Sequence, residues 1–584
     1  MFLLFSAIIW QLFKLDPAQM TELIEQIRDS VIGDKRSIKT PFGDKPLVYA
    51  DYTASGRSLS FIEEYICQQV LPFYANTHTE TSFTGAQTTA LREEARAQIR
   101  SSVNGGDEDQ VIFCGSGATA AINKLVDILN LRLPADLSTR HGLLENIPKG
   151  ERPVVFVGPY EHHSNELTWR ESIADVISIP LTHCGRIDIE ILDQQLQAYS
   201  HRPLLIGSFS AASNVTGIKS DVVAVSAVLK KHGALVFWDY AAAAPYLSID
   251  MNGAIPFDAV FISPHKFIGG PGTPGVLVAK RSIFKNSVPA VVGGGTVRYV
   301  TPHDHSYLED CERREEGGTP GIVESIRAGL VFKLQSEVGT AEIERREASF
   351  IQRALARFNQ CCNLRIMGSP DADRVSIMSL RFVHGDKDLH YGFIVSLLND
   401  LFGIQVRGGC SCAGPYGHSL LAMDMEYSRA IEAQVTLGAA VLRPGWVRLN
   451  FNYFIAEDEF EYLLRAIELV AAHGWRMLPY YSFDEESAVW KFQGQSNGMV
   501  SSLNNFSFAD RCRQKPSVFF EVESLNGKCE QAERELLKEH RIAEFSTLCL
   551  SDECERLRWF LLPQEAREML SPSRSPDRCF ASAS

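Results

Sequence analysis

Short apolar segments alternate with amphipathic segments between residues 110 and 280. The apolar segments have the length of buried strands, and they cover 111–114, 153–157, 204–209, 234–239, 259–263 and 275–279. Amphipathic segments such as 118–129 and 221–232 lie between several of them and predict helices. Strands that are apolar on both faces and alternate with helices predict a mostly parallel sheet covered on both sides. We therefore expect an α/β domain whose ligands bind at the carboxyl ends of its strands.

The pattern changes after about residue 326 and predicts a smaller α+β domain. Its expected elements are a helix at 341–358, a strand at 375–383, a helix at 389–401, a strand at 404–407, a strand at 446–453 and a helix at 457–472. Beyond residue 485 periodicity fades, which predicts a loosely ordered tail that is dispensable for chemistry. The expected divisions are an N-terminal segment at 1–44, a large domain at 45–325, a small domain at 326–484 and a partly disordered extension at 485–584.

Composition narrows the classes of partner. The 57 basic and 71 acidic residues give a net charge of −14, which argues against nucleic acid or an anionic membrane as the main partner.

The first thirteen residues, MFLLFSAIIWQLF, are apolar but too few to span a bilayer, and they lack the basic leader of a secretory signal. A buried or interfacial first helix is favoured over stable membrane insertion, although membrane attachment or a wrongly chosen start codon stays open.

The thirteen cysteines form no paired framework. Cys410 and Cys412 flank one serine, but no second cysteine pair or histidine pair accompanies them, so we expect no metal site. Mostly free thiols predict a reducing compartment, and we expect a cytoplasmic protein, with an organellar location left open.

Lys266 is the first candidate for chemistry. It ends the motif Ser-Pro-His-Lys at 263–266, directly after an expected strand, and a glycine-rich loop follows at 269–272. Burial at a strand end would lower the pKa of the amine and make it a nucleophile for a carbonyl cofactor. Taken alone, the motif is equally consistent with a surface lysine in a glycine loop.

Four further features follow the other strands of the expected sheet. The turn at 114–119, Cys-Gly-Ser-Gly-Ala-Thr, would present helix amides to a phosphate. Asp239 ends an apolar strand and needs a cationic partner, such as a pyridinium nitrogen. His162 could stack on a flat ring, and Asn214 could donate to a ring oxygen. Each has an ordinary structural explanation, but their convergence at one sheet edge predicts one site.

These motifs resemble the class V aminotransferase superfamily and, within it, the cysteine desulfurase/selenocysteine lyase group. The matching segments run in family order from about residue 45 to about residue 475, at 49–55, 115–118, 161–165, 213–217, 239–241, 265–266 and 318–320. The resemblance implies a PLP-dependent transferase of fold type I, with a mostly parallel, seven-stranded type of sheet and a smaller α+β C-terminal domain. PLP denotes pyridoxal 5′-phosphate.

The resemblance also implies residue roles. Lys266 would carry the cofactor as a Schiff base, Asp239 would pair with the pyridine nitrogen, His162 would stack on the ring, and Asn214 would reach its phenolic oxygen. The phosphate would be held by Ala118, Thr119, Ser263 and His265, and by Thr319 of the neighbouring subunit of a homodimer. Ala242 stands where the family often has a glutamine near the phenolic oxygen, which leaves Asn214 alone there.

The loop at 406–415 bears on the reaction. Cys412 directly precedes Ala-Gly-Pro, the place of the nucleophilic cysteine in desulfurases similar to selenocysteine lyase. Arg407 supplies nearby positive charge, which favours a thiolate, and Cys410 is a competitor or a resolving thiol. Arg448 matches the family arginine that grips a substrate carboxylate, and His78 matches a substrate-side histidine.

The favoured function is removal of sulfur from L-cysteine, which gives L-alanine and a persulfide on Cys412, with an amino acid as substrate and a sulfur-acceptor protein as a further candidate partner. The alternatives are a PLP-dependent lyase, epimerase or aminotransferase acting on another amino acid, in which Cys412 is dispensable, or a cofactor-binding scaffold without catalysis.

Overall fold

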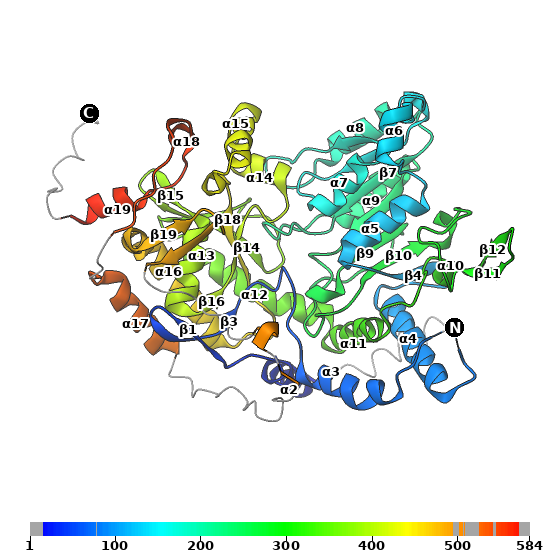
Figure 1. Cartoon of the computed structure of the whole chain (residues 1–584), viewed down its shortest axis with the longest axis horizontal. Coiled ribbons are helices and arrows are strands. Elements are labelled where there is room, and N and C mark those ends of the chain that lie inside the picture. Colours follow the sequence, from blue (N-terminus) through cyan, green and yellow to red (C-terminus); the bar gives the residue numbers. More distant parts are fainter. Residues whose placement is uncertain are drawn as a thin grey trace.

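The computed structural model describes residues 16–77, 79–493, 502–505, 507–508, 525–540 and 545–571, which form two lobes (Figure 1). The larger lobe is built on a seven-stranded sheet of order β4-β10-β9-β8-β7-β5-β6. Its strands are β4 Asp109–Cys114, β5 Val154–Val157, β6 Asp175–Ser178, β7 Leu205–Ser210, β8 Leu235–Asp239, β9 Ala259–Ile262 and β10 Gly275–Lys280. Only β10 runs antiparallel to its neighbours. The predicted α/β class with a mostly parallel sheet is confirmed.

Helices cover both faces of this sheet. Side chains alternate along each strand, so that Phe237 of β8 faces one helical layer while Val236 and Trp238 face the other. The first layer contains α5 Gly117–Ile128 and α7 Leu167–Arg170, and the second contains α8 Ile189–Ala198, α9 Val222–Lys231 and α11 Ile322–Val338. The strand β6, which the sequence pattern did not predict, lies at the sheet edge and is only partly buried.

The smaller lobe is an antiparallel sheet with helices on it. Its strand order is β13-β14-β18-β17, with a fifth strand, β15, on β14. The elements are α12 Thr340–Phe358, β13 Leu364–Ile366, β14 Ile377–His384, β15 Lys387–Leu389, α13 Tyr391–Phe402, β17 Arg407–Gly409, α14 Gly414–Leu420, α15 Met425–Thr436, β18 Trp446–Asn450 and α16 Glu457–His473. The single strand expected at 404–407 is two strands, because β16 Ile404–Gln405 pairs with β3 Val48–Tyr49 while β17 pairs with β18.

The segments before and after these lobes also pack on them. The N-terminal part contains α2 Pro17–Asp29 and the hairpin of β1 Ser37–Thr40 and β2 Gly43–Pro46. After the hairpin of β19 Tyr481–Asp484 and β20 Val489–Phe492 come α17 Leu525–Leu537, α18 Asp552–Leu557 and α19 Pro563–Leu570. Leu536, Phe560 and Ala566 are buried in the core of the small lobe. The sequence pattern did not predict these helices, and the apolar stretch at 1–13 lies outside the described residues.

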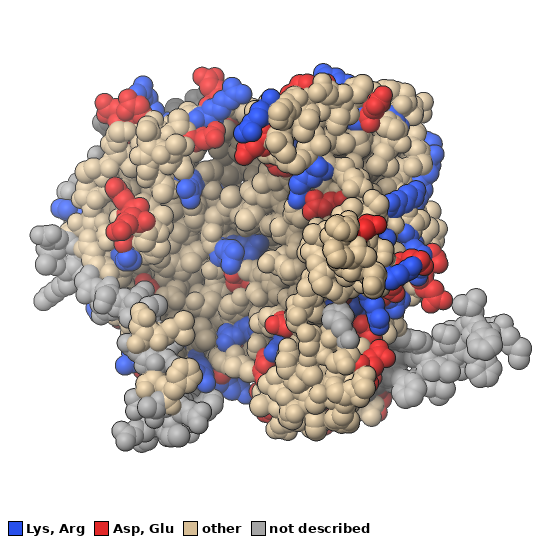
Figure 2. Space-filling view, turned by 45° about the vertical axis from the view of Figure 1, so that its right-hand side comes forward, with Lys and Arg blue, Asp and Glu red and all other residues tan. Residues whose placement is uncertain are grey.

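Charge on the face shown in Figure 2 is mixed, with acidic and basic side chains interspersed over both lobes. Across the described ranges, no helix is both long enough and apolar enough to cross a membrane.

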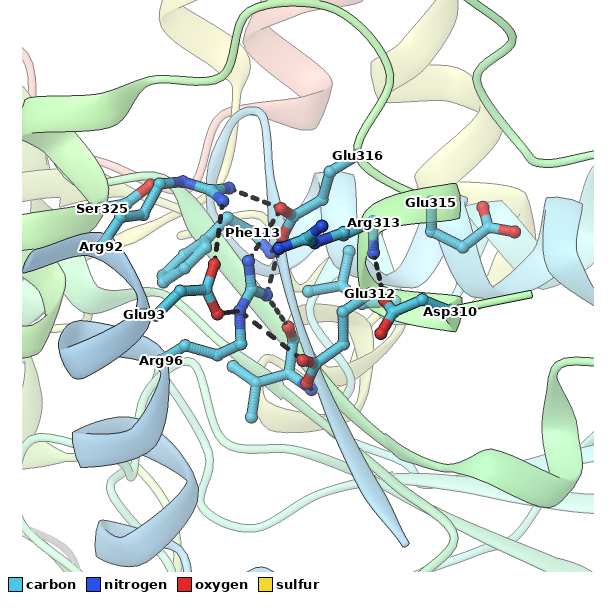
Figure 3. A network of polar contacts seen from close by, with 12 residues as sticks. Arg92, Glu93, Arg96, Phe113, Asp310, Glu312, Arg313, Glu315, Glu316 and Ser325 are labelled. Atoms are coloured by element: carbon cyan, nitrogen blue, oxygen red, sulfur yellow. Dashed lines mark hydrogen bonds and ion pairs between the residues drawn. The ribbon is translucent and has the colours of Figure 1, made fainter. Parts of the chain in front are cut away.

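A buried ionic network closes the free edge of β4 (Figure 3). Glu312 of α10 Cys311–Arg314 accepts a hydrogen bond from the Val111 amide, and Glu316 accepts one from the Phe113 amide, both at 2.7 Å. Arg96 of α4 Phe83–Ser102 pairs with Glu316 at 3.0 Å, and Arg92 pairs with the same carboxylate. These carboxylates satisfy backbone donors that would otherwise be left open at a sheet edge.

Glu316 is the centre of this network. Burial alone would raise the pKa of Glu316, but Arg96 and Arg92 outweigh burial and hold it below its ordinary value. The pair therefore stabilises the fold above the ordinary glutamate pKa, and this contribution is lost as the pH falls through the lowered value.

We predict that Glu316→Gln lowers the free energy of unfolding by about 3 kcal/mol at neutral pH, because it leaves two buried guanidinium groups without their partner. Urea unfolding followed by tryptophan fluorescence measures the change. Glu309→Gln is the matched control, since the ion pair of Glu309 with Arg298 is exposed. Equal unfolding midpoints for Glu316→Gln and the control would contradict the account.

Candidate active site

A cavity of about 220 Å³ lies at the carboxyl ends of the central strands, where the two lobes meet. The residues that line it are Thr53, Ala54, Ser116, Gly117, Ala118, Thr119, His162, Ser164, Ser210, Ala212, Asn214, Asp239, Ala241, Ala242, Ser263, His265, Lys266, Arg407, Ser411, Cys412 and Arg448. Of the predicted site residues that the structure describes, all except Thr319 are among them. The cavity thus gathers residues that lie up to 395 positions apart along the sequence.

Lys266, which is partly buried, and Asp239, which is buried, are two oppositely charged groups of this cavity. Lys266 follows β9 in a single helical turn, Pro264–Lys266, and Asp239 is the last residue of β8. Burial, opposed by Asp239 and helped by Arg448 and Arg407, lowers the pKa of Lys266 to about 8. Burial raises the pKa of Asp239, although the Ala241 amide donates to its carboxylate at 2.7 Å. The amine is therefore available in its neutral form near neutral pH.

The start of α5 forms the polar end of the cavity. Gly117 has a φ of +57°, which side chains rarely adopt, and a Cβ there would lie 2.9 Å from Ser263 Oγ. The Ala118 amide donates to Ser263 Oγ at 2.8 Å, and His265 Nδ1 lies 3.2 Å from Ser55 Oγ. Helix amides and hydroxyl groups of this kind suit an anion such as a phosphate.

His162 lies on the wall of the cavity in a neutral form. Burial, together with the charge of Lys266, lowers the pKa of His162 to about 4. Its Nδ1 accepts from the Ser164 amide at 3.1 Å, so Nε2 carries the ring proton. A neutral imidazole fixed in this way is suited to packing against a flat ring.

Glu161 anchors the turn that carries His162. Its carboxylate is buried and accepts hydrogen bonds from the Gly158 and Ser210 amides, the Ser210 hydroxyl and the Asn165 side chain. Burial raises the pKa of Glu161 to about 7 despite the bonds from Ser210 and Asn165. Glu161 lies in the segment 161–165 that resembles the family, but no role was predicted for it from the sequence.

Asn214 and Arg448 connect the cavity to the small lobe. Asn214 Nδ2 donates to the Ser411 carbonyl at 2.7 Å, and its Oδ1 is buried without a partner. The donor that the predicted contact with a phenolic oxygen requires is therefore taken up by the 410–413 loop. Arg448 donates to the Asn214 carbonyl and to Asp51, while its Nε is buried without a partner.

Asp51 joins two arginines at this end of the cavity. It accepts from Arg448 Nη2 and from Arg407 Nε, both at 3.1 Å. Arg407 is half exposed and Arg448 is buried, so Arg407 is the more accessible of the two. Asp51 stands inside the matched segment 49–55, yet only the structure reveals that it orients both guanidinium groups.

The loop at 410–413 crosses from β17 to the large lobe. Ser411 and Cys412 both have a φ of +56°. This left-handed conformation costs roughly 1–2 kcal/mol per non-glycine residue, so contacts must hold it. The His163 amide donates to the Cys412 carbonyl at 2.8 Å, and His163 Nε2 accepts from the Gly414 amide at 2.9 Å. His163 was missed at the sequence level because its partners are distant in the chain.

The two cysteines of this loop are placed differently. Both are exposed, but Cys412 lines the cavity and Cys410 is not among its lining residues. Cys410 instead lies near the Tyr391 hydroxyl, where it contributes to the raised pKa of that group, whose main cause is burial.

Thr319 is not among the residues that line the cavity. Thr319 is exposed, and its hydroxyl lies 3.4 Å from Asn76 Nδ2. His78 lies outside the described residues.

The fold and this cavity define an enzyme of fold type I. The profile of the class-V aminotransferases matches residues 48–462, and the chain belongs to this family. Enzymes of the family are generally PLP-dependent. A probable cysteine desulfurase of Halalkalibacterium halodurans is 28% identical over 374 residues, which cover 63% of this chain and 85% of that protein. A probable cysteine desulfurase of Streptomyces coelicolor is 26% identical, over 63% of this chain and 84% of that protein.

Solved cysteine desulfurases share the fold. The apo structure from Thermococcus onnurineus has a TM-score of 0.59 at 22% identity and covers 73% of this chain and 95% of its own. The structure of CsdA from Escherichia coli has a TM-score of 0.58 at 20% identity and covers 76% of this chain and 97% of its own. The chain is thus a desulfurase-like enzyme, with segments on both sides of the matched region.

We predict that Lys266 of the cofactor-free protein reacts with acetic anhydride with a pH midpoint near 8. Asp239→Asn should lower this midpoint, because it removes a carboxylate that stabilises the ammonium form. Arg407→Gln should raise it, because it removes a like charge. Peptide mass spectrometry of the acetylated lysines measures the midpoints, and shifts of the same sign in both variants would contradict these electrostatics.

Proposed function

We propose that the chain is a PLP-dependent cysteine desulfurase that converts L-cysteine to L-alanine and leaves the sulfur as a persulfide on Cys412. The observation that carries the proposal is the presence of the Cys412 thiol in the same cavity as Lys266, Asp239 and Arg448. L-cysteine and the thiol together contain all the atoms of L-alanine and the persulfide, so the reaction needs no further oxidant or reductant.

The cavity fits PLP in its unsatisfied polar groups. Asp239 is a buried carboxylate with one described hydrogen bond, and Arg448 Nε is buried without a partner. Asp239 would pair with the pyridine nitrogen and His162 would pack on the ring, while Lys266 would hold the cofactor covalently. The residues proposed for the phosphate are Ala118, Thr119, Ser263 and His265, with Thr319 from a neighbouring subunit. When bound, the cofactor supplies an electron sink for bonds at the substrate Cα.

The arginine end of the cavity would bind the substrate carboxylate. The buried Arg448 and the more exposed Arg407 share Asp51, so an incoming carboxylate can take over part of the Asp51 interactions. A fork of N–H groups suits this exchange, because carboxylates have the same planar geometry. His78 stays a candidate for the substrate side.

Lys266 would move the protons of the reaction. Because its pKa is lowered to about 8, the amine can accept a proton from the substrate Cα and return one to Cβ near neutral pH. Cys412, which lines the same cavity, would attack the substrate sulfur as a thiolate. The persulfide would stay on an exposed loop, where a sulfur-acceptor protein can reach it.

A homodimer follows from the proposed role of Thr319. This residue is exposed and outside the cavity of its own chain, as expected if it completes the site of a neighbouring subunit.

We predict that Cys412→Ser abolishes alanine formation from L-cysteine, because no other thiol lines the described cavity. The visible absorbance of the bound cofactor should be unchanged, since the thiol is not one of its proposed ligands. Cys410→Ser is the matched control and should retain most of the turnover. Alanine analysis and absorbance spectra of the three proteins measure both outcomes.

Full alanine production by a Cys410→Ser/Cys412→Ser double variant would overturn the desulfurase mechanism. That result would favour a PLP-dependent lyase, epimerase or aminotransferase acting on another amino acid.

A further inference from the structure

The C-terminal segment at 551–561 lies against the part of the chain that follows Cys412. In Figure 1, α18 stands beside α15 at the top of the small lobe. The Tyr427 hydroxyl of α15 donates to the Leu557 carbonyl at 2.7 Å, and Trp559 Nε1 donates to the Leu442 carbonyl at 3.0 Å. Two hydrogen bonds thus connect the segment at 551–561 to the part of the chain between α14 and β18.

The same segment also joins the small-lobe sheet. The Leu561 amide donates to the Asp388 carbonyl at 2.8 Å, and the Asp388 amide donates to the Trp559 carbonyl at 3.3 Å. This parallel bridge extends the sheet beyond β15, and Arg381 holds Asp388 in place through a bidentate ion pair. The position of Trp559 is therefore set by backbone bonds.

The Trp559 ring is connected to the start of the 410–413 loop through one intermediate side chain, Tyr391. It stacks on Tyr391 at 6.2 Å between centroids and 9° between planes. Tyr391 in turn lies close to Gly408 of β17 and to Gly445, the residue before β18. A Cβ at Gly408 would lie 2.6 Å from Tyr391 Cδ2, and one at Gly445 would lie 2.8 Å from Cε1. Tyr391 thus fills the space beside β17 that the glycines leave.

β17 ends at Gly409, and the loop that carries Cys412 begins at the next residue. The left-handed conformations of Ser411 and Cys412 need support from both sides. His163 and Asn214 supply it from the large lobe. On the small-lobe side, the layer of Tyr391 backed by Trp559 supports the strand from which the loop starts.

We propose that the segment at 551–561 is a clamp on the 410–413 loop, in which Trp559, acting through Tyr391, is a positioning residue for Cys412. The contribution to desulfuration rests on the proposed function, but the positioning of the thiol does not. This proposal differs from the expectation of a tail that is dispensable for chemistry, and the two predict different results for variants of Trp559.

Trp559→Ala tests the clamp. We expect amide hydrogen exchange in the peptide containing residues 408–413 to become about tenfold faster, because the supporting layer is lost. Cys412 should also react faster with iodoacetamide. Peptide mass spectrometry measures the rate of this alkylation. With L-cysteine, kcat should fall about tenfold while KM and the cofactor absorbance stay unchanged, because the thiol is misplaced and the remaining site is intact.

Trp475→Ala is the matched control. Trp475 is also partly buried in the small lobe and stacks on a histidine, His384, at 4.3 Å and 19°. It should leave exchange and alkylation at the loop unchanged. Trp559→Phe should restore most of the loop protection, since it keeps an aromatic ring on Tyr391 and loses only the bond to Leu442.

Unchanged exchange at 408–413 in a folded Trp559→Ala protein would overturn the clamp. If this variant does not fold, Tyr427→Phe decides, because it removes only the bond to Leu557 and should loosen the loop by a smaller factor; an unaltered loop then overturns the proposal as well. Faster exchange and alkylation together with a wild-type enzyme that forms no alanine would refute the desulfurase function and leave the clamp standing.

Discussion

The structure depends on the burial of one amine, Lys266, among polar groups at the carboxyl edge of the central sheet. An isolated ammonium in that position would be costly, and the fold meets this cost with Asp239 on the neighbouring strand and by lowering the pKa of the amine to about 8. The parallel arrangement is what brings the two residues together, because the ends of adjacent strands meet at one edge. The same edge supplies the start of α5 and the turn held by Glu161.

The small lobe supplies the site residues that the central sheet does not contain. Arg448, Arg407 and Cys412 all come from the small lobe or the loop leaving it, and each is held by a group of the other part of the chain. Asn214 is shared, because its side chain supports the Ser411 carbonyl and its backbone carbonyl accepts from Arg448. The geometry of the thiol and that of the arginine end are consequently linked through a single residue of the large lobe.

Much of the fold could be predicted from the sequence, because a buried parallel strand appears there as a continuous apolar run. Six of the seven strands of the large sheet follow from that pattern, and β6 escapes it because an edge strand is only partly buried. The helices α18 and α19 escape it because six and eight residues give too few turns for a clear period. Lys266 and Asp239 were found as strand-end residues, whereas the roles of Asp51 and His163 depend on partners hundreds of positions away, which no local pattern encodes.

The central claim is that Lys266 is the residue that holds the cofactor, and borohydride reduction of the PLP-loaded protein tests it most directly. Reduction fixes the bond between an amine and a carbonyl cofactor, and peptide mass spectrometry then locates it. The account predicts a single modified peptide that contains Lys266, with no labelling in Lys266→Ala. A label on another lysine, or no label in a protein that retains its visible absorbance, would contradict it.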